Sequence, residues 1–200
     1  MIAKEKVENM NGQNKNQYDL FDKDELLALS RLDIENGRLD EALLKLKRVL
    51  SEAQPPAKAI AMTARLYAQL GLFDRAELLF RRYVELDPEA VTELFQLGMS
   101  LFDGGKIEEA VEVWDKVLNL QSFYPPAIFY KGLVLAQKGE VDAARTQLDE
   151  LLRKIPTDNL YFSRARDLMQ ELDNSRVIAS QTEEFDTLVA MDKDAYKTIQ

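Results

Sequence analysis

The sequence contains no cysteine and no histidine. Without cysteine the chain can form no disulfide framework, no catalytic thiolate and no thiolate-bound zinc site. Without histidine it can form no His-based catalytic triad. The lack of cysteine does not fix the redox compartment. Together, the two absences exclude several of the commonest hydrolytic and zinc-dependent chemistries.

Long apolar runs are also absent. No run in the chain reaches the roughly 20 residues that a membrane-spanning helix needs. Residues 1–22 carry no apolar core of the length found in signal peptides. We therefore expect a cytoplasmic protein without membrane insertion.

The chain has fewer basic than acidic residues: 26 Lys and Arg residues against 35 Asp and Glu residues give a net charge of −9. Neither nucleic acid nor an anionic membrane attracts an acidic surface, so we expect neither as a partner. The 200 residues are 46% apolar and 30% charged, which is typical of a folded chain. This length suffices for one domain or one array of small units.

Glycine is scarce, but four of the eight glycines are equally spaced. Gly37, Gly71, Gly105 and Gly139 follow one another at intervals of 34 residues. The six prolines lie near the ends of the resulting units. An alanine follows each of the four glycines after five residues: Ala42, Ala76, Ala110 and Ala144. A fixed period of this length is typical of a stacked repeat protein.

Each unit has the pattern of a helix, a turn and a second helix. In the third unit, Leu94, Leu97 and Leu101 recur at helical spacing, and Gly104 and Gly105 then end the first helix. The eighth position of every unit is small, which lets the two helices of a hairpin approach closely. The small residues at this position are Ser30, Ala64, Gly98 and Gly132.

These positions resemble the tetratricopeptide repeat (TPR), a helical hairpin of 34 residues. The resemblance covers four units, at about residues 23–56, 57–90, 91–124 and 125–156, and Leu97-Gly98 with Ala110 and Trp114 is its best match. Two features depart from the family pattern: the early tryptophan is absent, and Asp33 stands where the family has a tyrosine. The resemblance implies an all-α fold, a right-handed α-solenoid of about four TPR repeats.

The flanking segments complete the predicted organisation. Residues 1–22 are expected to be a flexible polar segment, and Asp22 with Glu25 should cap the first helix. A helix over residues 157–174 should cap the last apolar face. Residues 175–200 form an acidic tail with a short amphipathic segment. Three interpretations of this tail stay open: a solvated segment, a segment that folds back into the binding groove, and a segment exchanged in a homodimer.

No catalytic motif remains once the repeat pattern is assigned. The chain has no spare Gly-rich loop for a phosphate group. Carboxylate pairs such as Glu108-Glu109 and Glu183-Glu184 fit solvated helix faces better than acid–base pairs. We therefore expect no enzyme activity, no cofactor and no metal site.

In the TPR family, the first helices of the repeats line a concave groove that binds protein segments. Cations gather in the N-terminal half of the corresponding positions, and aromatic residues and methionine gather in the C-terminal half. The predicted groove residues are Arg31, Lys58, Met62, Arg65, Phe95, Gln96, Met99, Phe102, Phe129, Tyr130 and Leu133.

This distribution favours a protein or peptide partner with apolar anchors and some acidic residues. In an alternative interpretation, Phe95 and Phe102 belong to the core. The family's carboxylate clamp is not expected, because its asparagines are missing; Leu27, Met62 and Thr92 are among the residues at the clamp positions.

The sequence thus predicts a non-enzymatic scaffold or adaptor that captures a partner segment in its groove. The alternative is a cytoplasmic secretion-type chaperone that shields an apolar segment of its client. No residue of the sequence identifies the partner itself.

Overall fold

The computed structural model of the chain describes residue 18 and residues 20–174. This part of the chain is helical and contains no strand. Its helices are α2 (Lys23–Glu35), α3 (Leu39–Leu50), α4 (Ala57–Gln69), α5 (Phe73–Leu86), α6 (Val91–Asp103), α7 (Ile107–Leu120), α8 (Pro125–Gln137) and α9 (Val141–Lys154). Residues 160–174 are helical as well. Most of the predicted N-terminal polar segment and all of the predicted acidic tail lie outside the described residues.

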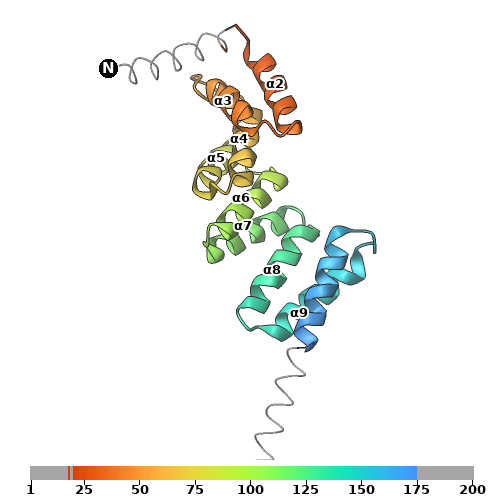
Figure 1. Cartoon of the computed structure of the whole chain (residues 1–200). Helices are drawn as coiled ribbons and strands as arrows, with labels where there is room; N and C mark the ends of the chain where they lie inside the picture. The colour runs from red at the N-terminus through yellow and green to blue at the C-terminus, as the bar shows by residue number, and fades with distance from the viewer. Residues whose placement is uncertain (1–17, 19, 175–200) are drawn as a thin grey trace, which may run out of the picture. The chain divides into compact units, whose positions relative to one another are not determined.

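Consecutive helices pack as hairpins: α2 against α3, α4 against α5, α6 against α7 and α8 against α9. Figure 1 shows these helices along the chain. The hairpins of residues 1–120 also contact one another, through α3 with α4 and α5 with α6. The chain forms two compact units, residues 1–120 and residues 121–200. The predicted all-α class of helical hairpins is confirmed.

The equally spaced glycines form the turns inside the hairpins. Gly37, Gly71, Gly105 and Gly139 have φ angles of 73°, 70°, 80° and 79°. In each turn, the residue after the glycine donates its backbone N–H to the carbonyl five positions earlier, over 2.8–2.9 Å. This bond belongs to the Schellman motif, which ends a helix with one left-handed residue. The 34-residue spacing therefore reflects one backbone conformation that recurs in every hairpin.

The first helix begins at the predicted N-cap. The Asp22 carboxylate accepts hydrogen bonds from the backbone N–H groups of Asp24 and Glu25, both at 2.8 Å. In return, the Glu25 carboxylate accepts the Asp22 N–H at 2.8 Å. This reciprocal capping box satisfies backbone donors that the first turn of a helix leaves unpaired.

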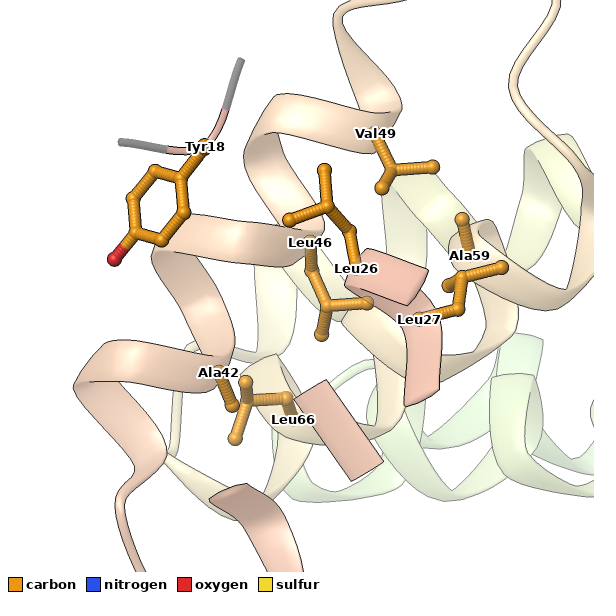
Figure 2. Close-up of a cluster of buried hydrophobic side chains, with 8 residues drawn as sticks. All are labelled: Tyr18, Leu26, Leu27, Ala42, Leu46, Val49, Ala59 and Leu66. Atoms are coloured by element: carbon orange, nitrogen blue, oxygen red, sulfur yellow. The ribbon is translucent and has the colours of Figure 1, made fainter. Parts of the chain in front are cut away.

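The core at the start of the first unit is built from three helices and a residue that precedes them. Leu26 and Leu27 of α2 lie beside Leu46 of α3 and Ala59 of α4 (Figure 2). Tyr18 is buried at the edge of this cluster. Its hydroxyl donates a hydrogen bond to the Glu41 carboxylate at 3.0 Å. The repeat core therefore extends N-terminally to Tyr18, which lies within the segment predicted to be flexible.

Asp33, the departure from the family pattern, lies in a charged cluster of the first hairpin. Its carboxylate accepts hydrogen bonds from Lys45 at 2.7 Å and from Arg38 at 2.9 Å. Burial raises the pKa of this carboxyl, but the two cations outweigh burial and hold the pKa below its ordinary value. Lys45 also lies 5.4 Å from the centre of the Tyr18 ring. The cluster joins both helices of the hairpin to the residue that precedes them.

The small residues occur where helices touch. Ala42, Ala76, Ala110 and Ala144 are fully buried. At Gly98, an added Cβ would lie 2.2 Å from the indole nitrogen of Trp114. The predicted reason for these small residues, close approach of two helices, is therefore confirmed at Gly98.

Overpacking at Ala110 tests this close contact. We expect Ala110→Leu to lower the free energy of unfolding by about 1–3 kcal/mol, because the added bulk has no space. Urea denaturation followed by circular dichroism would measure the change. The control is Glu112→Leu, which adds an apolar side chain at an exposed position of the same helix. Equal denaturation midpoints for Ala110→Leu and the unmodified protein would contradict the prediction.

The second unit is organised around α8, α9 and residues 160–174. Ala165 and Leu172 are buried in one cluster with Ala144, Leu148 and Leu151 of α9. Residues 160–174 thus cover apolar side chains of the preceding hairpin. That this segment caps the whole array, and that the array contains four repeats, remain predictions.

Candidate functional site

A pocket of about 490 Å3 opens in the first unit. We call it the basic pocket. It is lined by residues of four helices: Arg31 and Ile34 of α2, Lys58, Ala61, Met62, Arg65, Leu66 and Gln69 of α4, Tyr83 of α5 and Glu93 of α6. Helix α4 contributes six of the ten lining residues.

The pocket brings together four of the predicted groove residues. Arg31, Lys58 and Arg65 are exposed, and Met62 is half-buried. Arg31 and Arg65 occupy the same position in successive hairpins, 34 residues apart, so stacking of the hairpins accounts for their proximity. Their role in binding remains a prediction.

The rim of the pocket is basic. It carries three cations and a single carboxylate, that of Glu93. Arg65 of α4 forms an ion pair with Glu93 of α6, and their side chains are 48% and 12% exposed. Neither Arg31 nor Lys58 forms an ion pair with another residue of the described part of the chain. Two cations are therefore available to a ligand in a chain whose net charge is −9.

The pocket also has an apolar wall and a tyrosine. Ile34, Met62 and Leu66 supply aliphatic and thioether surface. Burial raises the pKa of the Tyr83 hydroxyl, and the nearby Glu93 raises it further. Tyr83 is therefore protonated at neutral pH and able to donate a hydrogen bond. The arrangement could hold an apolar side chain beside anionic groups.

Tyr83 and Glu93 are not among the predicted groove residues. Tyr83 lies on the second helix of its hairpin, whereas the family positions used for the groove lie on first helices. Glu93 lies on the first helix of the next hairpin, at a position outside the mapped set. Its pairing with Arg65, 28 residues earlier in the chain, depends on the packing of α6 on the preceding hairpin.

Of the four predicted groove residues of α6, Phe95 is buried in the core and the other three are half-buried. The Phe95 side chain is 5% exposed, and its ring stacks on Trp114 with centroids 6.4 Å apart. The ring of Phe102 lies 5.8 Å from Trp114, and Phe102, Gln96 and Met99 are half-buried. Both phenylalanine rings pack against the large indole ring of Trp114. Phe95 therefore offers little surface to a ligand. Its position agrees with the core alternative.

The remaining predicted residues belong to the second unit. Phe129 is 7% exposed, because Tyr130 and Tyr161 pack on its ring at centroid distances of 5.3 and 5.6 Å. Tyr130 and Leu133 of α8 are half-buried. Phe129 thus contributes to the core of its unit, and Tyr130 and Leu133 retain accessible surface.

No group of three or more acidic side chains in residues 18 and 20–174 could hold a metal ion. In the same part of the chain, no helix has the length and apolar character needed to cross a bilayer.

Comparison with known families decides the classification. Two tetratricopeptide-repeat family models match the chain, one over residues 27–97 and the other over residues 95–159. The chain belongs to the tetratricopeptide-repeat family. TPR proteins generally mediate protein–protein interactions, and most have no enzymatic activity.

Curated relatives of this TPR protein are similar over short regions. The RNA polymerase-associated protein CTR9 of Caenorhabditis elegans is 29% identical over 83 residues. TPR repeat-containing protein MJ0941 of Methanocaldococcus jannaschii is 41% identical over 64 residues. The matches cover 40% and 32% of this chain but only 7% and 19% of those relatives.

Solved TPR structures share the fold of this protein. A TPR protein from Parabacteroides merdae superposes with a TM-score of 0.69 at 21% identity, over 82% of this chain and 64% of the other. MamA AMB-1 superposes with a TM-score of 0.62 at 22% identity, over 72% and 79%. An O-GlcNAc transferase mutant from Thermobaculum terrenum matches with a TM-score of 0.58 at 22% identity, over 66% of this chain and 26% of the enzyme.

Proposed function

We propose that this TPR protein is a non-enzymatic, cytoplasmic scaffold or adaptor that captures a partner segment in the basic pocket. The observation that carries the proposal is the convergence of Arg31, Lys58, Met62 and Arg65 on one cavity with an apolar wall. Pockets with apolar lining and a few oriented polar groups are typical ligand sites. The family's general role in protein–protein interactions supports a peptide rather than a small molecule as the ligand.

The partner segment would first be attracted by charge and would then make apolar contacts. The exposed side chains of Arg31 and Lys58 attract acidic residues of the partner and raise the rate of association. An apolar partner side chain then packs against Met62 and Ile34, which slows dissociation. The helices of the pocket are already held by their own cores, so the ordering cost falls mainly on the partner.

The chaperone alternative depends on a broad apolar surface that shields a client. Phe95 and Phe129 are both buried, which reduces the apolar surface available for that role. The accessible surface therefore favours the adaptor over the chaperone.

A charge reversal at Lys58 tests the proposal. We expect Lys58→Glu to weaken binding of the partner about tenfold, mainly by slowing association, and to flatten the salt dependence of association. The partner would be one recovered by affinity capture with the full chain and identified by mass spectrometry, and surface plasmon resonance at several salt concentrations would measure its binding.

The matched control is Lys116→Glu, which makes the same charge change at an exposed position of α7. Thermal midpoints of both variants should match that of the unmodified protein. If the partner binds Lys58→Glu and Lys116→Glu with the same affinity, the basic pocket is not the binding site.

A further inference from the structure

The Arg65–Glu93 ion pair leaves the basic pocket with two unpaired cations instead of three. It connects α4 to α6, which belong to successive hairpins. Arg31 and Lys58 remain without ion-pair partners among the described residues. Glu93 thus stands in the pocket at a place where an acidic ligand would otherwise meet a third cation.

Glu93 is well placed to hold this position. Its side chain is only 12% exposed, whereas that of Arg65 is 48% exposed, so the carboxylate is the more firmly enclosed partner. Glu93 also lies in the first turn of α6, where the helix dipole stabilises a negative charge. A ligand carboxylate that approached Arg65 would have to displace Glu93 or bear its repulsion.

We propose that Glu93 is a specificity-determining residue that limits the pocket to partner segments with two acidic side chains beside an apolar one. One acidic group pairs with Arg31 and the other with Lys58, and the apolar side chain packs against Met62 and Ile34. A third acidic group is rejected because Glu93 already occupies Arg65. This inference rests on the proposed function, since it names the partner chemistry of the same pocket.

Charge complementarity supports an acidic occupant over a neutral one. The chain as a whole is strongly acidic and repels acidic segments at long range. The net charge of the pocket lining is nevertheless +2, from Arg31, Lys58 and Arg65 against Glu93. A neutral apolar segment would leave Arg31 and Lys58 uncompensated, and a basic segment would be repelled by them.

Selection from a random peptide library tests the inference directly. A displayed library of random dodecapeptides is selected on the full chain, on Glu93→Gln and on the control Glu89→Gln, which neutralises an exposed residue just before α6. We expect the full chain and Glu89→Gln to enrich peptides with two acidic residues close to one apolar residue. Glu93→Gln should enrich peptides with three acidic residues.

Fluorescence anisotropy then gives affinities for synthetic peptides from the selection. Glu93→Gln should bind a peptide with three acidic residues about tenfold more tightly than the unmodified protein does. For a peptide with two acidic residues, the two affinities should differ by less than about twofold. Arg65→Gln should change affinity in the opposite direction, because it leaves the Glu93 charge unpaired beside the ligand. Thermal midpoints of all variants verify that the fold is retained.

The possible failures have distinct meanings. If enriched peptides are neutral or basic but lose binding on Lys58→Glu, the acidic-partner inference is wrong and the proposed function stands. If no enriched peptide depends on Lys58, both the inference and the proposed function fail. If a peptide with one phosphoserine binds more tightly than the two-acid peptide, a phosphate group is the ligand and the two-carboxylate inference is wrong. If Glu93→Gln and the unmodified protein enrich the same peptides, Glu93 does not determine specificity.

Discussion

Replacing Trp114 by alanine should lower the free energy of unfolding by about 3–5 kcal/mol. The indole is fully buried and packs against Phe95 and Phe102 of the neighbouring helix. Its loss would leave a large cavity between α6 and α7. The two phenylalanine rings would also lose the side chain against which they pack. Guanidinium denaturation followed by circular dichroism would measure the effect.

Gly98 provides a second test of the same contact. A methyl group at this position would overlap the Trp114 indole, so Gly98→Ala should destabilise the protein by about 1–3 kcal/mol. In a Trp114→Leu background, the same change should cost clearly less, because the smaller side chain leaves space. A double-mutant cycle isolates this coupling. Additive effects of the two changes would show that Gly98 and Trp114 do not constrain each other.

Replacing Asp33 by alanine should have the second largest effect, a loss of about 3 kcal/mol of unfolding free energy. The Asp33 side chain is 8% exposed and neutralises Lys45, which is itself only 12% exposed. Removing the carboxylate leaves the ammonium group enclosed beside Glu41 at 3.4 Å as its remaining acidic partner. Arg38 is half-exposed and can return to water.

The pH dependence of Asp33→Asn separates charge from packing. The pKa of Asp33 is lowered in the folded chain, so its contribution is fully present above the unfolded pKa of about 3.9. That contribution is lost as the pH falls through the folded pKa. The pKa of Lys45 is raised: burial lowers it, but the hydrogen bond to Asp33 and the neighbouring charges outweigh burial. Its contribution therefore disappears only as the pH rises through a folded value above about 10.4.

Between about pH 5 and pH 9, the stability difference between Asp33→Asn and the unmodified protein should thus be constant. It should narrow below about pH 4 and again at high alkalinity. Urea denaturation across this range would measure it. A difference that does not change down to pH 2 would mean that Asp33 acts through packing rather than through its charge.

The hairpins could be predicted from the sequence because their signals are local. The glycine of each turn, the small residue at the eighth position and the buried alanine each report on a contact within one hairpin. Asp33 departed from the pattern, and its cluster with Lys45 depends on side chains from two helices. The family pattern alone could not predict this cluster.

The pocket could be predicted only in part. Arg31, Lys58, Met62 and Arg65 came from family positions on first helices, whereas Tyr83 enters from a second helix. Helical spacing alone does not determine whether the Phe95 ring turns toward the groove or toward the core. Trp114, on the facing helix, decides it by offering a larger apolar contact. Phe129 is buried by Tyr161, from a segment beyond the repeats.

The four turn glycines share a property that reaches beyond their own hairpins. Each has a positive φ, and no atom beyond the glycine and its two chain neighbours lies within 4 Å of a Cβ added there. Alanine at any of the four would therefore impose the same backbone strain, about 1–2 kcal/mol, without a steric clash. Unequal losses of global stability would then report how strongly each hairpin is coupled to the unfolding of the rest. The four glycine-to-alanine variants would therefore measure the cooperativity of unfolding with the same perturbation in every hairpin.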